Sequence, residues 1–191
     1  MIDELAATSK QVGLELIDMS DTLTSEMQTW GDVLAQNPES TTATISAGFV
    51  TKPTAKPGRE LTIDVQIPPD KKAMLRTWAI ETKIGDDQQE YFNNIQLTFE
   101  VDNQQVRDLV AKGRAITRED IRRLLKDQTS RLARITVSNK SGGDGTKQTH
   151  GERYDFTIPE LNQHPDEVAK VDKALQTVQQ ILKQSVANSL H

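Results

Sequence analysis

The sequence predicts an α+β protein: an antiparallel β-sheet of four to six strands with a packed helix, flanked by long N- and C-terminal helices that form a coiled-coil-like stalk or bundle. Near both ends of the chain, apolar residues recur at intervals of three and four, which is typical of helices that bury one stripe. Between these regions the apolar period is two, as in half-buried strands. We therefore divide the chain into an N-terminal long helix (1–36), an α+β domain (41–158) and a C-terminal helix (163–189) that packs with the N-terminal helix or a partner.

The N-terminal helix is predicted from a 3-4-3-4 spacing that only Ser9 and Glu26 interrupt. This spacing is typical of a coiled-coil or bundle helix. Gly13 and Gly31 should weaken the helix by about 1 kcal/mol each. Asn37-Pro38 ends it, because the residue before a proline avoids the helical region. The apolar positions are Ile2, Leu5, Val12, Leu16, Met19, Leu23, Trp30 and Val33.

Four strands are predicted between residues 41 and 101, where apolar residues alternate with polar ones. The connections are short and contain Pro, Gly and Asp, which favours an antiparallel meander because parallel neighbours need a long crossover. One face of this sheet should be apolar and need a cover. The alternating residues are Ala43, Ile45, Ala47 and Phe49; Leu61, Ile63, Val65 and Ile67; Met74, Trp78, Ile80 and Ile84; and Ile95, Leu97, Phe99 and Val101.

The second half of the chain is predicted to contain three helices and two strands. A short helix covers 103–113, and a second begins after the N-cap Thr117, with two acids in its first turn. Strands over 132–137 and 154–158 form a hairpin with a long glycine-rich loop. The last helix begins at Pro165, which suits a first helical position. Its apolar stripe consists of Val168, Val171, Leu175, Val178 and Leu182.

Composition excludes several classes of protein. The chain has no cysteine, which excludes disulfide scaffolds, thiolate zinc sites, iron–sulfur clusters and cysteine nucleophiles. Apolar runs are too short to span a bilayer, and acids stand where a signal peptide needs a basic start. The three histidines have no metal-ligand spacing. We expect a soluble, cytoplasmic protein with no membrane partner, no metal, no cofactor and no catalytic residues.

Charge is unevenly distributed along the chain. Residues 1–40 carry a net charge of -7, whereas residues 112–147 carry +6. One interpretation is that these cations neutralise the acidic N-terminal helix. The alternative is a polyanion-binding segment at 112–134 that contacts nucleic acid through counterion release, although residues 103–153 lack the aromatics that stack on bases. The candidate polyanion-binding residues are Arg118, Arg122, Arg123 and Lys126.

Residues 142–146 read Gly-Gly-Asp-Gly-Thr. This pentapeptide resembles the GGDGT signature of the diacylglycerol-kinase, sphingosine-kinase and NAD-kinase families, which implies a nucleotide-binding loop that opens a helix. The other interpretation is a hairpin loop, because glycine and aspartate are what turns require. We favour the loop, since the residues that follow lead into a strand.

The function favoured by the sequence is a non-enzymatic interaction, assembly or chaperone-like protein. Two apolar stripes at opposite ends of the chain each need a partner surface, which points to a protein partner or a homo-oligomer. Trp30 is a candidate anchor for a partner helix. The predicted partner or oligomer seam consists of Leu5, Val12, Leu16, Met19, Leu23, Trp30, Val171, Leu175, Val178 and Leu182.

Overall fold

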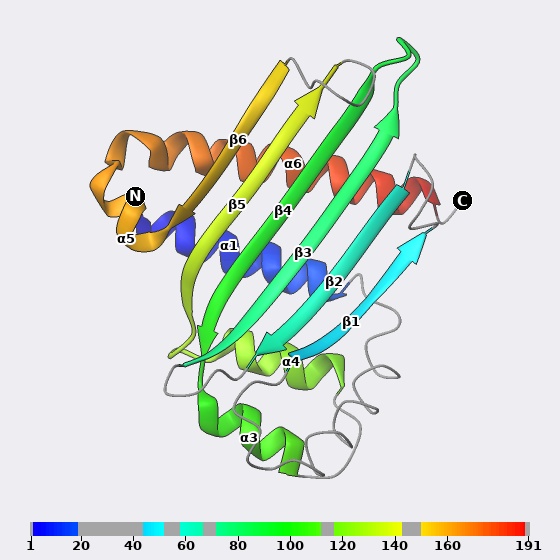
Figure 1. Ribbon diagram of the computed structural model, residues 1–191. Helices are drawn as coiled ribbons and strands as arrows, with labels where there is room; N and C mark the ends of the chain where they lie inside the picture. The colour runs from blue at the N-terminus through cyan, green and yellow to red at the C-terminus, as the bar shows by residue number, and fades with distance from the viewer. Residues whose placement is uncertain are drawn as a thin grey trace.

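The computed structural model describes residues 2–18, 44–51, 58–66, 72–111, 117–142 and 150–189. The elements alternate from helix to sheet to helix along the chain, and the predicted α+β class is confirmed (Figure 1). They are α1 (Ile2–Asp18), β1 (Thr44–Thr51), β2 (Gly58–Gln66), β3 (Ala73–Ile84), β4 (Glu90–Val101), α3 (Asn103–Ala111), α4 (Arg118–Lys126), β5 (Arg131–Ser141), β6 (His150–Thr157), α5 (Ile158–Gln163) and α6 (Pro165–Ser189).

The sheet has six strands in the order β1-β2-β3-β4-β5-β6, and each is antiparallel to the next. The predicted meander is therefore confirmed. In Figure 1, α1 and α6 lie together behind the sheet, whereas α3 and α4 lie beyond one end of it. We call the side that α1 and α6 pack against the covered face, and the opposite side the open face.

The hydrophobic core lies between the covered face and the two terminal helices. Cross-strand rows such as Leu75, Phe99 and Leu132 bring together residues that are at most 8% exposed. Leu16 of α1 and Leu175 of α6 belong to the same buried cluster. Since an apolar side chain contributes roughly 1.5–3 kcal/mol when fully buried, this cluster is the main source of stability.

The predicted coiled-coil-like stalk or bundle is not confirmed over the residues described, where α1 and α6 contact each other and the sheet. Both helices lie flat on the covered face, where the apolar residues of their stripes are buried within one chain. Glu15 of α1 accepts a hydrogen bond from Gln179 of α6 and lies 3.6 Å from the Lys183 ammonium. The rest of the predicted N-terminal helix, 19–36, lies outside the described residues.

Gly13 has a packing role that its helix propensity does not indicate. It is buried in α1, and a Cβ at this position would lie 3.0 Å from Leu125 and 3.2 Å from the Phe99 ring. The missing side chain therefore lets α1 approach both α4 and the sheet closely.

The face assignment of the third strand is wrong in the sequence analysis. Met74, Trp78 and Ile80 lie on the open face and are half-buried, whereas Ala73, Leu75, Thr77 and Ala79 are buried on the covered face. The larger apolar residues suggested the core phase. The buried side of β3 instead has one large apolar residue, Leu75, among smaller or polar ones, and α1 packs against this strand.

Helix starts follow the predicted capping chemistry. Thr117 caps α4: its side chain accepts a bond from Asp120 N at 3.2 Å, and its own N–H donates to the Asp120 carboxylate at 2.9 Å. Thr157 and Glu160 form a second capping box at the start of α5, a short helix that we did not predict. Among the described helices, none combines the length and apolar character that crossing a bilayer requires.

Candidate functional site

The covered face ends in a polar row at the end of the sheet nearest the β3–β4 turn. Strand register aligns Glu81 of β3 with Asn93 of β4, and Asn93 with Asn139 of β5. The neighbouring row is apolar, with Ala79, Ile95 and Val137. We call Glu81, Asn93 and Asn139 the end row. It marks where the hydrophobic core stops.

A pocket of about 930 Å³ opens at the end row. Its volume lies within the range of small-molecule sites, roughly 300–1,000 Å³. Sheet, turn and helix each contribute to it. The described lining residues are Glu81, Lys83, Ile84, Gly85, Asp86, Asp87, Tyr91, Asn93, Asn139, Ile181 and Gln184. We call this the end pocket.

Two polar side chains in the end pocket are buried without partners among the described residues. Glu81 and Asn93 are each 4% exposed. The Asn93 Oδ1 atom accepts no hydrogen bond. Buried polar groups are normally paired, and an unpaired buried carboxylate is especially unfavourable. The end row therefore offers two acceptors that have no partner among the side chains described.

The rim of the end pocket is shaped by the turn between β3 and β4. Asp87 accepts a hydrogen bond from the Tyr91 hydroxyl at 2.6 Å and one from Gln89 N at 3.1 Å. The Tyr91 bond, with the Gln89 N–H, holds the pKa of the Asp87 carboxyl below its usual value, and the same contact raises the pKa of Tyr91. Asp87 thus stays ionised at the mouth of the pocket.

The open face has an aromatic residue near its middle. Trp78 Nε1 donates to Asn94 Oδ1 at 2.7 Å, and the Arg76 guanidinium lies 5.8 Å from the Trp78 ring centroid. These contacts hold the indole in one position, and the distance to Arg76 is that of a cation–π contact. None of the described helices covers this face in Figure 1.

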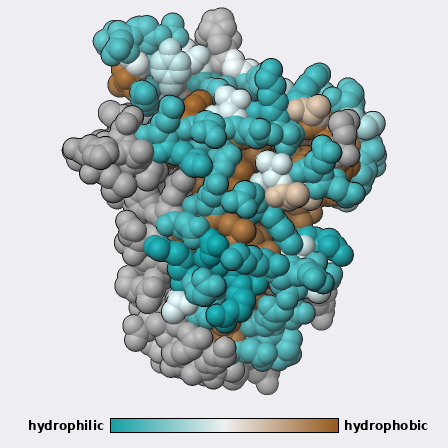
Figure 2. Space-filling view, turned by 180° about the vertical axis from the view of Figure 1, so that it is seen from behind, coloured by the Kyte–Doolittle hydropathy of each residue, from teal (hydrophilic) through white to brown (hydrophobic). Residues whose placement is uncertain are grey.

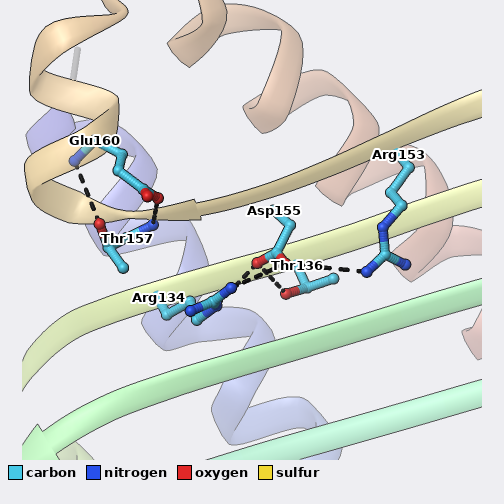
Figure 3. Close-up of polar contacts among 6 residues, drawn as sticks. All are labelled: Arg134, Thr136, Arg153, Asp155, Thr157 and Glu160. Atoms are coloured by element: carbon cyan, nitrogen blue, oxygen red, sulfur yellow. Dashed lines mark hydrogen bonds and ion pairs between the residues drawn. The ribbon is translucent and has the colours of Figure 1, made fainter.

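A charged cluster occupies the β5–β6 side of the same face (Figure 3). The Asp155 carboxylate accepts two bonds from Arg134, each 2.9 Å long, and one from the Thr136 hydroxyl at 2.9 Å, with Arg153 at 3.9 Å. The Arg134 bonds lower the pKa of Asp155, and Asp155 raises the pKa of Arg134. Arg134 and Arg153 remain about half exposed, so this side of the face is basic.

The predicted partner or oligomer seam has an intramolecular position wherever it is described. Its described members are at most 2% exposed and belong to the core of their own chain. The surface on the helix side is mainly hydrophilic, with hydrophobic residues in small patches (Figure 2). The described members are Leu5, Val12, Leu16, Val171, Leu175, Val178 and Leu182; Met19, Leu23 and Trp30 lie outside the described residues.

The candidate polyanion-binding residues do not form one free stripe. Arg122 donates to both carboxylate oxygens of Asp18 at 2.6 Å, and it also lies 3.8 Å from Glu119. Arg118 is engaged as well. Arg123, whose side chain is 65% exposed, and the exposed Lys126 face solvent. The contact between α4 and α1 agrees with the interpretation that these cations neutralise the acidic N-terminal region.

The glycine motif at 142–146 lies mostly outside the described residues. Gly142 is described and has a φ of 121°, a conformation that favours glycine. The first described residues after the motif, from His150, form strand β6. In the kinase families the motif opens a helix, whereas here the next described element is a strand, as expected for a hairpin loop.

Comparison with known proteins adds no relative: no protein-family model, no curated protein and no solved structure matches the chain.

Sequence reasoning missed the end row. Its signal was present, because Glu81 follows Leu75, Thr77 and Ala79 at the same period of two, and Asn93 precedes Ile95 in the core phase. Assigning Trp78 to the core placed Glu81 on the solvent side and hid that signal.

Proposed function

We propose that the protein is a non-enzymatic assembly protein that associates with a second copy of itself through the open face of its sheet. This proposal keeps the self-association that the sequence favours and moves it to another surface. The observation that carries it is the position of Trp78 on the open face, away from the core. Tryptophan and arginine are the residues most enriched at the centres of protein interfaces.

The apolar surface supports this choice of face. Met74, Trp78, Ile80 and Phe92 are all half-buried within one chain, and the first three lie in one line along β3. The stripes of α1 and α6, in contrast, are already buried. Association is driven by apolar area that the monomer leaves accessible, and these half-buried side chains on the open face provide such area.

Charge supports a second copy as the occupant. Arg134 and Arg153 lie on the β5–β6 side of the face, whereas the acidic positions Glu60 and Asp64 pair with Ile80 and Arg76 on the β2 side. A two-fold axis along the strand direction would set the basic side of each copy opposite the acidic side of the other. Such an isologous interface is self-complementary, as most homodimers are.

The solution mass of matched charge variants tests this proposal. We expect wild type to be a dimer by light scattering, and Trp78→Glu to be a monomer because it puts a charge at the centre of the interface. The control is Gln180→Glu, the same charge change on the exposed side of α6, which should leave the dimer intact. A wild type that stays monomeric at every concentration would contradict the proposal.

A second variant guards against a folding defect in Trp78→Glu. Arg153→Glu reverses charge at a side chain that is 51% exposed, and Asp155 keeps its two bonds to Arg134. The fold should survive while the dimer weakens. Adding Glu60→Lys, at the position that shares a register row with Arg153, to Arg153→Glu should restore association, which a general loss of stability cannot do.

The polyanion alternative has one supporting observation, the exposed pair Arg123 and Lys126 on α4. Its test is a salt titration of binding to DNA, RNA and heparin, with Arg118, Arg122 and Lys126 changed to glutamine. Binding that weakens steeply with salt and is lost in the variant supports this function.

A further inference from the structure

We propose that the end pocket binds a small organic cation, an ammonium or guanidinium group that carries a short apolar chain, with Glu81 as its counter-ion. This site is separate from the open face, because the end row lies on the opposite side of the sheet. Its function is therefore independent of the proposed self-association.

The Glu81 carboxyl group lines the end pocket. Glu81 is 4% exposed, and among the side chains that the structure describes it has no hydrogen-bond or ion-pair partner; the side chain of Arg59, its cross-strand neighbour in β2, is not among them. Lys83 lies two residues further along the same strand and also lines the pocket, but it is exposed. A buried carboxylate is stabilised when it is paired and hydrogen-bonded. A bound cation supplies both the charge and the donors.

Asn93 is the cross-strand neighbour of Glu81 in β4. It is also 4% exposed, lines the same pocket, and has an Oδ1 atom without a partner. An ammonium or guanidinium group carries several N–H donors and so can bond Glu81 and Asn93 together. A ligand that only accepts hydrogen bonds would leave both acceptors unpaired.

The charge and the apolar side chains of the remaining lining residues favour a cation that carries an apolar chain. Asp86 and Asp87 at the rim, with Glu81 inside, outnumber the one cation, Lys83, so the described lining has a net charge of -2. Ile84, which is 50% exposed, and Ile181 provide apolar contacts for the rest of the ligand. An organic cation with a few methylene groups fits this combination better than a metal ion, because no three His, Asp or Glu side chains among the described residues are grouped so that they could hold a metal.

The experiment is a titration of the full chain with n-butylammonium and n-butylguanidinium, followed by the backbone amide signals in NMR spectra. We expect shifts centred on Gly85, Asn93 and Asn139. The neutral isostere of butylammonium, 1-butanol, and the anion butyrate should cause none. Shifts that are equally large with these two probes would overturn the proposal.

Matched variants identify the counter-ion. Glu81→Gln keeps the shape but removes the charge, and it should weaken binding about tenfold, as expected for loss of one charged hydrogen bond. Glu100→Gln, on the open face, is the control and should bind as wild type does. If Glu81→Gln fails to fold, Asn93→Leu takes its place and should also weaken binding.

Two sources can supply this cation, and a third arm separates them. A free amine is indicated if butylammonium binds more tightly than Nα-acetyl-lysine amide, and a protein side chain if the order is reversed. Binding of neither cation, with a folded wild type, would overturn the proposal. Dimer mass in the Glu81→Gln variant should be unchanged, so failure here is distinct from failure of the self-association proposal.

Discussion

Arg122 of α4 bonds Asp18 at the end of the described part of α1, and both carboxylate oxygens lie 2.6 Å from one guanidinium nitrogen. The pair joins two residues that are 104 positions apart in the chain. It connects a residue of the acidic N-terminal region with one of the basic segment. The modest net charge of -5 therefore conceals a contact between oppositely charged parts of the molecule.

Replacing Arg122 by glutamine should lower the free energy of unfolding by about 0.5–1 kcal/mol, since the pair is partly exposed. Urea unfolding at low and high salt measures the change. The matched control is Arg123→Gln, whose side chain is 65% exposed and should matter less. The difference between the variants should shrink at high salt because screening weakens the pair. Equal effects would contradict the role assigned to Arg122.

Stability at acid pH should depend on Asp127, which joins three helices. The hydroxyl of Thr129, the Gln105 amide and the Thr129 N–H lower the pKa of Asp127 to about 2. The Asp127 carbonyl also accepts a bond from Lys10 of α1. Because the pKa is lower in the folded state, the contribution is present above about pH 4 and is lost as the pH falls toward 2.

Asp127→Asn tests this pH dependence. Its free energy of unfolding should fall less between about pH 5 and pH 2 than that of wild type, because the variant has no carboxylate to protonate. Asp108→Asn, an exposed change on α3, serves as control. NMR titration of the wild-type carboxyl should place its pKa near 2. A carboxyl that titrates at the ordinary value for aspartate would refute the network.

Leu175→Ala should reduce the free energy of unfolding by about 2–5 kcal/mol, because Leu175 is fully buried between α6 and the sheet. Chemical denaturation measures the loss, with the exposed Lys173→Ala as the control. The loss should be independent of protein concentration, since the contacts lie within one chain. A loss that grows on dilution would return Leu175 to an intermolecular seam.

Gly151 should tolerate no side chain. Its φ is 133°, and a Cβ would overlap the carbonyl oxygen of Asn139 in the neighbouring strand. Gly151→Ala should therefore destabilise the protein by about 1–3 kcal/mol. Lys140→Ala changes its cross-strand partner and should have a much smaller effect. Thermal unfolding of the two variants makes the comparison, and equal melting temperatures would disprove the strain.

Local patterns predicted most of the fold. Alternation gave the strands, and Thr117 and Pro165 gave the starts of α4 and α6, because capping and turn chemistry act over a few residues. The face of β3 was missed, because Trp78 and Leu75 lie in opposite phases and size alone suggested the wrong one. Burial depends on which helix covers which face, and that information is not local.

The candidate site was harder to predict for the same reason. Glu81, Asn93 and Asn139 are separated in sequence and become neighbours only through strand register. Arg122 was identified from its spacing, but spacing could not reveal Asp18 as its partner. Individual residue types were visible from the sequence, whereas their pairing required the tertiary structure.

The order of the elements has a consequence for synthesis. The strands pair in chain order and can do so as they leave the ribosome, but α6, which helps to cover them, follows all of them. Until α6 emerges, it cannot cover the apolar side of β4 and β5. A nascent chain stalled before Pro165 would expose this surface, and such intermediates are prone to aggregate. Docking of α6 is thus the step that buries the exposed apolar side of the paired strands.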